Sequence, residues 1–372
     1  MKARQLMVRA HGLIGILMGL FIIVVSLTGS AIVFQAELDT FLNRSLFQVT
    51  PQNQVVSVDT VLDSARSAHS ELPLSFIQVP KTSDASYIIN QQLPHEQRLQ
   101  TFVDPYTGNV LGSRVWERSL IGFIYAVHHN LLAGLTGQIV VGVVGLGLLF
   151  IAISGTMLWT GWRKLAIGFK IRWNAPSALL NYDLHNVGGL LSTVFLVTVA
   201  ATGVAIVALH LLPMLAPSVA TKTAPNQPTL ALSYLIEKAN AAMPEGKITT
   251  IEFSAQDPEL LTIRKKLPTQ DTGRFDFSTV ELNQYSGAVI ASTKVAKAEG
   301  LHKLMTTIAT LHFGTFGHLP TRFLYLFLGL MPTILFITGL ANLQHHRLIE
   351  NRREVALNLA QSVESSVNSH SD

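Results

Sequence analysis

Long apolar segments alternate with long mixed segments along this chain. Four apolar segments approach the ~20 residues that a ~30 Å hydrocarbon core requires, and they predict membrane-spanning helices at residues 12–34, 137–160, 188–212 and 323–343. The first apolar run is longer than the ~7–15 residues of a signal-peptide core and no small-residue cleavage site is clear, so we expect a retained helix. The pattern therefore predicts a multi-pass membrane protein with two long loops.

Each long loop, about 36–135 and 213–320, has the pattern of a small folded module. One helix is predicted in each loop, at 58–69 and at 230–242, because apolar residues recur there with helical spacing. Short alternating runs predict strands at 74–79, 87–89 and 99–103 in the first loop, and at 248–253, 260–264 and 277–282 in the second. Similar turns, DPYTG at 104–108 and NQYSG at 283–287, each precede a further strand. We expect two small α+β modules.

Histidines stand at repeated distances from Thr-Gly or Ser-Gly pairs inside the spans. His11 and His185 each lie 18 residues before a glycine, Gly29 or Gly203. The other two, His128 and His312, each lie 27 residues before the glycines of Ser154-Gly155 and Thr338-Gly339. The chain therefore has the form of one unit used twice, a parallel repeat whose pseudo-two-fold axis runs along the membrane normal. Four histidines on four helices are what two bis-histidine haems need.

Composition narrows the chemistry. The chain has 372 residues, 48% of them hydrophobic and 13% charged, which fits a membrane protein. Because cysteine is absent, disulfides, thiolate iron–sulfur clusters and covalently attached c-type haem are excluded. Any redox centre must use histidine or a bound organic cofactor. We find no GxGxxG motif after a strand and no Walker motif, so a dinucleotide site or an ATP motor has no support.

The net charge of +4 is concentrated beside the spans, in Lys2, Arg4, Arg9, Arg163, Lys164, Lys170, Arg172, Arg347, Arg352 and Arg353. Basic residues flank spans on the cytoplasmic side, so both termini are expected in the cytoplasm and both modules on the far side, the periplasm of a bacterium. The charge is thus a topology signal, and no nucleic-acid partner is expected.

The resulting division of the chain is a terminus with the first span (1–35), the first module with an interfacial helix (36–135), the second span (136–161), a cytoplasmic loop (162–184), the third span (185–213), the second module with an interfacial helix (214–321), the fourth span (322–346) and a cytoplasmic tail (347–372).

His11 and His185 begin their helices at the cytoplasmic edge, and 18 residues make about five helical turns, so each histidine shares a face with its glycine. Further small residues lie on the same faces, including Gly15 and Gly189. Small-residue helix packing would explain the glycines but leaves the duplicated histidine unexplained. We favour axial ligation of haem by this pair, with Gly15 and Gly189 beside the macrocycle.

For His128 and His312 the interval of 27 residues makes about seven and a half turns, so an unbroken helix would separate histidine and glycine onto opposite faces. We therefore place each on a short interfacial helix at the outer surface, where they ligate a second haem. A substrate-contacting role, or His129 as the ligand in place of His128, is the alternative. His210 and His318 are further candidates for the outer site. For His210 we favour a capping or snorkelling role over ligation of the outer haem, and the role of His318 is open.

The motifs HGLIG at 11–15, VH at 127–128, DLH at 183–185 and LHFG at 311–314, with the Thr/Ser-Gly pairs between them, resemble the PepSY-associated transmembrane family. The likeness covers nearly the whole chain, and the loop modules resemble PepSY domains. This family includes inner-membrane siderophore reductases of the FoxB type.

The resemblance implies an oxidoreductase of the bacterial inner membrane that carries haem b, with His11, His128, His185 and His312 as the axial ligands of two haems. Electrons from a quinol or a flavoprotein would reach a ferric siderophore in the periplasm and release its iron. No catalytic side chain is assigned. Two other classes of protein stay open. One is a transporter of the siderophore or iron, and the lack of carboxylates in the four predicted spans argues against it. The other is a cofactor-free regulatory or binding protein.

Overall fold

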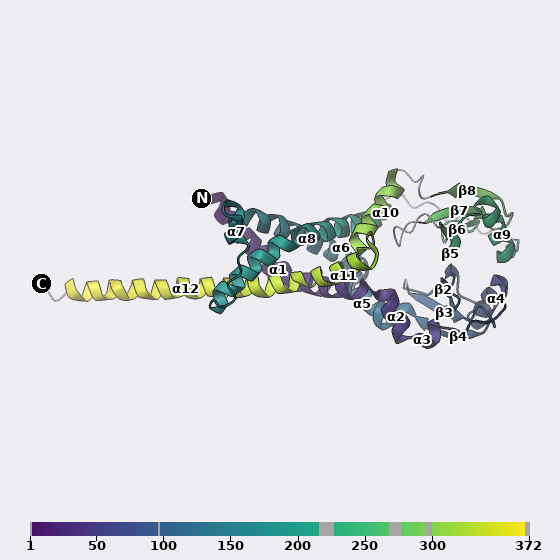
Figure 1. The fold of residues 1–372 in the computed structure, drawn as a ribbon, viewed down its shortest axis with the longest axis horizontal. Coiled ribbons are helices and arrows are strands. Elements are labelled where there is room, and N and C mark those ends of the chain that lie inside the picture. The colour runs from purple at the N-terminus through teal and green to yellow at the C-terminus, as the bar shows by residue number, and fades with distance from the viewer. Residues whose placement is uncertain (1, 96, 216–226, 268–276, 295–299, 369–372) are drawn as a thin grey trace. The chain divides into compact units, whose positions relative to one another are not determined.

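The computed structural model describes residues 2–95, 97–215, 227–267, 277–294 and 300–368 (Figure 1). The chain divides into two compact units. One contains Met1–Ser30, Ala133–Val204 and Leu326–Asp372, and the other contains Ala31–Leu132 and Ala205–Tyr325. Within the described residues, four helical segments are long and apolar enough to cross a membrane: Ala3–Ile32, Gly134–Arg163, Ser177–Leu212 and His318–Ile349. The four predicted spans are therefore confirmed as helices of membrane-spanning length.

The first unit is built mainly from α1 (Lys2–Ile32), α6 (Gly134–Leu158), α8 (Ser177–Leu215) and α12 (Met331–Asn368), joined in part by η2 (Thr160–Arg163) and α7 (Leu165–Gly168). Two boundaries differ from the sequence prediction. Helix α8 begins eight residues before residue 185, and α12 runs through most of the expected tail. The fourth span is interrupted between α11 (His318–Leu328) and α12. Pro332 lies in the first turn of α12, where the N–H that proline lacks would make no hydrogen bond within the helix.

The longer α8 corrects one sequence-based argument. Asp183 lies inside this helix, so the third span does carry a carboxylate. Its two oxygens accept hydrogen bonds from the Arg172 side chain at 2.8 and 2.6 Å and from the Arg172 backbone N–H at 3.0 Å. The carboxylate is therefore neutralised by an arginine close to it in the chain.

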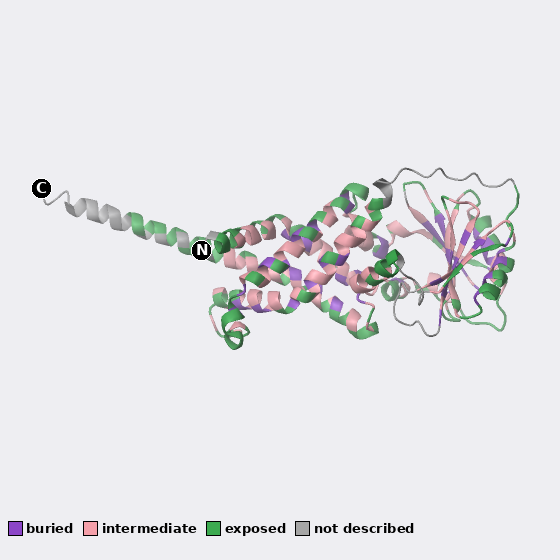
Figure 2. Ribbon diagram, turned by 90° about the horizontal axis from the view of Figure 1, so that it is seen from above, coloured by how far each residue is buried: buried purple, intermediate pink, exposed green. Residues whose placement is uncertain are grey.

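Large apolar side chains cover the outside of the four helices. Only 11–22% of the most apolar window of each span is buried within the chain. Leu17, Leu20, Leu191 and Val194 are all more than half exposed, as Figure 2 shows for many positions on these helices. Such surfaces are stable when lipid tails cover them.

The described residues of the second unit form one eight-stranded sheet in the order β4-β3-β2-β1-β5-β6-β7-β8. The strands are β1 (Leu74–Gln78), β2 (Tyr87–Gln92), β3 (Arg98–Val103), β4 (Val110–Val115), β5 (Lys247–Phe253), β6 (Leu260–Lys266), β7 (Ser278–Asn283) and β8 (Val289–Thr293). Strands β1 and β5 pair antiparallel, with Ile77 opposite Ile251. The edge strand of one predicted module therefore pairs with the edge strand of the other, and the two modules share one sheet.

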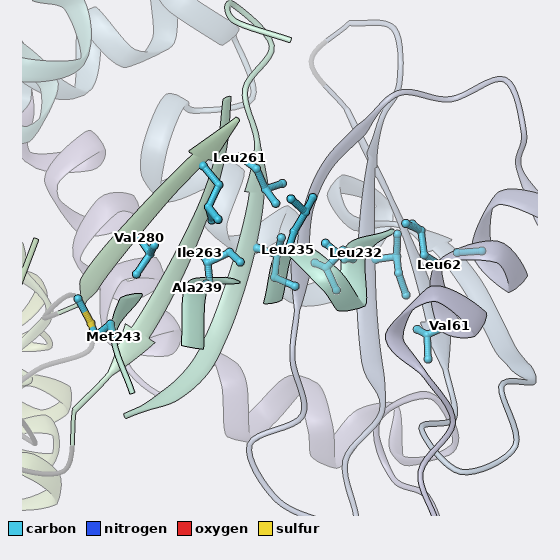
Figure 3. Packing of buried hydrophobic residues seen from close by; sticks show 14 of the residues in the cluster. Val61, Leu62, Leu232, Leu235, Ala239, Met243, Leu261, Ile263 and Val280 are labelled. Atoms are coloured by element: carbon cyan, nitrogen blue, oxygen red, sulfur yellow. The ribbon is translucent and has the colours of Figure 1, made fainter. Parts of the chain in front are cut away.

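One hydrophobic core serves both halves of the sheet. Helices α4 (Val58–Ala68) and α9 (Leu232–Ala242) contribute Val61 and Leu235, which pack in one cluster with Ile77 and Ile251 (Figure 3). The carboxylate of Asp59 in α4 accepts the backbone N–H of Leu232 at 2.6 Å and so caps α9. The two halves therefore stabilise each other through packing and through a helix cap.

The two halves also use the same turn after their third strand. Asp104 Oδ1 accepts the backbone N–H groups of Tyr106 and Thr107, and Asn283 Oδ1 accepts those of Tyr285 and Ser286. Each turn closes on a glycine with φ +72°, a conformation that residues with a Cβ rarely adopt. The turns predicted from the sequence are confirmed.

The second unit also contains α2 (Gln35–Leu42), α3 (Arg44–Phe47), η1 (Trp116–Arg118), α5 (Leu120–Asn130) and α10 (Gly300–Phe313). Helices α2 and α3 were not predicted from the sequence. Asp39 of α2 is 5% exposed and receives two hydrogen bonds from the Arg114 guanidinium of β4, at 2.7 and 2.5 Å. A bidentate pair of this kind fixes α2 against the sheet.

Candidate functional site: paired histidines

In the first unit, two of the predicted histidines lie next to each other with perpendicular ring planes. His11 of α1 and His185 of α8 have ring centroids 6.4 Å apart, with the ring planes at 86°. Both side chains are half-buried among the helices. The structure thus brings together the two histidines that occupy equivalent places in the sequence pattern.

The Nδ1 atom of His11 is held by a residue on another helix. It lies 2.8 Å from Ser154 Oγ of α6. Because the Ser154 hydroxyl donates to the Ile151 carbonyl at 3.2 Å, its oxygen is left to accept from a protonated His11 Nδ1. In the tautomer with the proton on Nδ1, the lone pair of His11 is on Nε2, the nitrogen that can bind a metal.

His185 is held in the same way, with one more partner. Its Nδ1 lies 3.0 Å from the Leu335 carbonyl and 3.2 Å from Thr338 Oγ1, both in α12. A carbonyl only accepts hydrogen bonds, so His185 Nδ1 carries the proton and Nε2 carries the lone pair. Thr338 lies 184 residues after Ser154, the same interval as that between His128 and His312.

The glycines beside these rings differ from those expected. A Cβ on Gly155 would lie 3.2 Å from His11 Cε1, and one on Gly339 would lie 3.0 Å from His185 Cε1. Sequence spacing linked these glycines to His128 and His312, so this contact was missed. A Cβ on Gly189 would meet Leu335 at 3.7 Å, whereas one on Gly15 would have no described atom within 4 Å.

In the second unit, His128 of α5 and His312 of α10 form another pair, with ring centroids 6.3 Å apart and planes at 46°. Each lies on a short helix that ends before the following span, as the spacing predicted. Ser119 precedes α5 as its N-cap, and its hydroxyl accepts the Gly122 N–H at 3.0 Å. The short-helix interpretation of both histidines is confirmed.

The end of α10 is fixed by several contacts. Gly314 follows the helix with φ +65°, and a Cβ there would lie 2.5 Å from Tyr325 Cγ. The Tyr325 hydroxyl donates to the Leu311 carbonyl at 2.5 Å, and the Thr321 hydroxyl donates to the Gly314 carbonyl at 2.6 Å. These bonds satisfy carbonyls at the helix end and so hold His312 in place.

The other histidines predicted for the outer site, His129, His210 and His318, differ in their surroundings. His129 of α5 and His210 of α8 have ring centroids 6.0 Å apart, with planes at 88°, and Tyr125 stacks on His129 at 5.5 Å. Burial lowers the pKa of His129, and the nearby His210 lowers it further. His318 is exposed at the start of α11, in a left-handed conformation with φ +57°.

Arg322 of α11 is a residue whose part in the fold the sequence did not reveal. Its guanidinium donates to both carboxylate oxygens of Glu37, at 2.6 and 2.8 Å, and to the Val33 carbonyl at 2.8 Å. It also lies over the Phe34 ring, 4.3 Å from its centre. Arg322 therefore supports the break between α1 and α2.

Six of the described histidines lie in three ring pairs. Among the described residues, no group of three or more histidines, aspartates or glutamates is placed to hold a metal ion. A closed tetrahedral zinc site is therefore not supported there. Two imidazoles facing each other suit an ion whose remaining ligands come from another molecule.

These features define a multi-pass membrane protein with an antiparallel α+β unit and histidine pairs between its helices. The family model described as PepSY-associated TM region matches residues 8–342, so the chain belongs to that family. No protein with a curated description matches this chain.

Proposed function

We propose that the protein is a haem-b-containing oxidoreductase of the bacterial inner membrane that passes electrons to a ferric siderophore in the periplasm. In this proposal the chain is a parallel tandem repeat, both termini are cytoplasmic and the sheet belongs to two PepSY-like modules. Two sets of helix, four strands and interfacial helix in the same order support the repeat. The basic residues beside the spans support the orientation.

The observation that carries the proposal is the separation of the two repeated histidine pairs. With metal–imidazole bonds of about 2.0–2.1 Å, two rings on opposite sides of one metal have centres roughly 6.4 Å apart. The observed separations are 6.4 Å for His11 and His185 and 6.3 Å for His128 and His312. Both pairs therefore suit axial ligation of haem iron.

The hydrogen bonds of the inner pair fit the same role. Metal-ligating histidines commonly donate their second ring N–H to an oxygen, which orients the ring and raises its basicity. Ser154 is the acceptor beside His11, and the Leu335 carbonyl and Thr338 are the acceptors beside His185. Open space beside Gly15 leaves room for a flat group next to His11.

When bound, haem b supplies one-electron transfer. The residues of the chain would have the other tasks: two imidazoles would hold the iron of each haem, the oxygens beside Nδ1 would set the tautomer of His11 and His185, and the apolar helices would exclude water. A quinol or flavoprotein donates electrons on the cytoplasmic side. Reduction of Fe(III) to Fe(II) weakens its binding to hard oxygen ligands, so the siderophore releases its iron.

Proteoliposomes test this function directly. Haem-loaded protein is reconstituted with a membrane-permeant quinol, and a ferric hydroxamate siderophore is added together with an Fe(II)-specific chromogenic chelator. We expect Fe(II) to form with wild-type protein and with the control His69→Ala, and to fall severalfold or more with His11→Ala. Equal rates in liposomes without protein would refute the proposal.

A transporter remains the second proposal, because the repeat and the interruption before Pro332 are features of transporter helices. It predicts siderophore or iron accumulation in vesicles without any reductant. The carboxylate of Asp183, the acidic group in the third span, is paired with Arg172 and so is poorly suited to an ion relay. A cofactor-free binding protein would instead be colourless after expression with ample haem.

A further inference from the structure

A third histidine pair stands outside the repeated set. His129 and His210 come from α5 and α8, 6.0 Å apart between ring centroids. The position that corresponds to His129 in the second half, 184 residues later, is Phe313. This pair therefore has no counterpart in the other half, whereas each haem-ligand pair proposed above joins equivalent positions of the two halves.

The surroundings of this pair allow access by an ion. His210 is exposed and His129 is half-buried. Tyr125 stacks on His129 with nearly parallel planes, at 12°, which limits rotation of the imidazole. One ring is thus held in place, and the other is exposed near the end of its span.

The separation of the rings differs slightly from that of the other pairs. Rings on opposite sides of one metal have centres roughly 6.4 Å apart, and the 6.0 Å between His129 and His210 is shorter. The two rings are near enough to bind one metal ion together. Water or oxygen atoms of a chelate would supply the remaining ligands.

We propose that His129 and His210 form a two-histidine binding site for a divalent transition-metal ion. Imidazole favours ions such as Fe(II), Ni(II), Cu(II) and Zn(II), whereas hard ions favour carboxylates. Among the described residues no cluster of three or more histidines and carboxylates occurs, so the other ligands of the ion would come from water or a chelate. If the proposed reductase function is correct, Fe(II) leaving the siderophore is the ion this site receives. The site itself does not depend on that function.

Zinc is the probe, because haem iron and zinc are counted separately by mass spectrometry. Tag-free, haem-loaded, full-length protein in detergent is stripped with a chelator and dialysed against buffered Zn(II). Wild-type protein should bind one equivalent that His129→Ala and His210→Ala each weaken by about tenfold or more, with unchanged haem content and size-exclusion profile. His69→Ala, which changes a partly buried histidine of the same unit, should bind zinc like wild type.

Three outcomes would overturn this site. The first is that wild-type protein binds no zinc at micromolar concentrations. The second is that His69→Ala weakens zinc binding as much as His129→Ala does. The third is that His129→Ala and His210→Ala each lose one haem, which would make this pair haem ligands. Loss of haem from His11→Ala is a separate measurement, so the zinc site and the reductase proposal can fail independently.

Discussion

Replacing Ser154 with alanine tests whether a hydroxyl on a neighbouring helix tunes the inner histidine pair. The change removes the oxygen 2.8 Å from His11 Nδ1 and leaves the backbone bonds of α6 intact. Loss of such a partner typically weakens metal binding by about 10–100-fold, or about 1.4–2.7 kcal/mol. We expect faster haem loss and a shifted midpoint potential for the inner haem.

The structure also predicts an asymmetry between the two halves. His185 Nδ1 has two oxygens within reach, so Thr338→Val leaves the Leu335 carbonyl as an acceptor. Thr338→Val should therefore weaken haem binding less than Ser154→Ala does, by about 1 kcal/mol of binding free energy. Ser154→Thr, which keeps a hydroxyl and copies the other half, should behave like wild type.

Haem transfer to apomyoglobin gives the dissociation rate, and spectroelectrochemistry gives the midpoint potential. The predicted order of haem loss is Ser154→Ala fastest, Thr338→Val intermediate, and Ser154→Thr equal to wild type. The reasoning is refuted if Ser154→Ala retains wild-type haem loss and potential, or if Thr338→Val has the larger effect.

Three further changes have expected outcomes. Arg322→Met removes both hydrogen bonds to Glu37 and the one to the Val33 carbonyl. Thermal unfolding in detergent should show a loss of stability of about 1–3 kcal/mol, and Arg322→Lys should lose less stability. Lys265 is fully buried and donates to Asn240 at 2.8 Å and to the carbonyl at the end of α9. Gln91 donates in the same way to the carbonyl at the end of α4. Lys265→Gln can keep this hydrogen bond, so it should unfold at a higher temperature than Lys265→Met. Burial lowers the pKa of Lys265 below its ordinary 10.5. Between the folded pKa and 10.5 the unfolded chain therefore binds one more proton than the folded chain, so the stability of wild type relative to Lys265→Gln should rise with pH in that window. A fall in relative stability with pH there would contradict this prediction. Gly314→Ala forces a Cβ against Tyr325 at φ +65° and should cost about 1–3 kcal/mol, with loss of the outer haem seen in the difference spectrum and no effect on the inner one.

Local patterns in the sequence predicted much of the fold. The spans and the strands of both modules follow from hydrophobic periodicity, and the separate helices of His128 and His312 follow from a spacing that one helix cannot satisfy. Each of these features depends on residues close together in the chain, which is why periodicity finds them.

The rest depends on contacts between distant residues. Spacing along α1 says which face His11 occupies, but not that Ser154, 143 residues later, lies against it. The pairing of β1 with β5 depends on two exposed strand edges, whose partners periodicity leaves undefined. Asp39 and Arg114, 75 residues apart, likewise gave no local signal.

The ratio of haem to protein is the most direct test of the central claim that two repeated histidine pairs hold haem. Purified wild-type protein, expressed with ample haem, should show reduced-minus-oxidised bands of haem b and two haems per chain. His11→Ala and His128→Ala should each lose one haem, and His69→Ala should lose none. A colourless wild-type preparation, or unchanged haem content in both variants, would contradict the account.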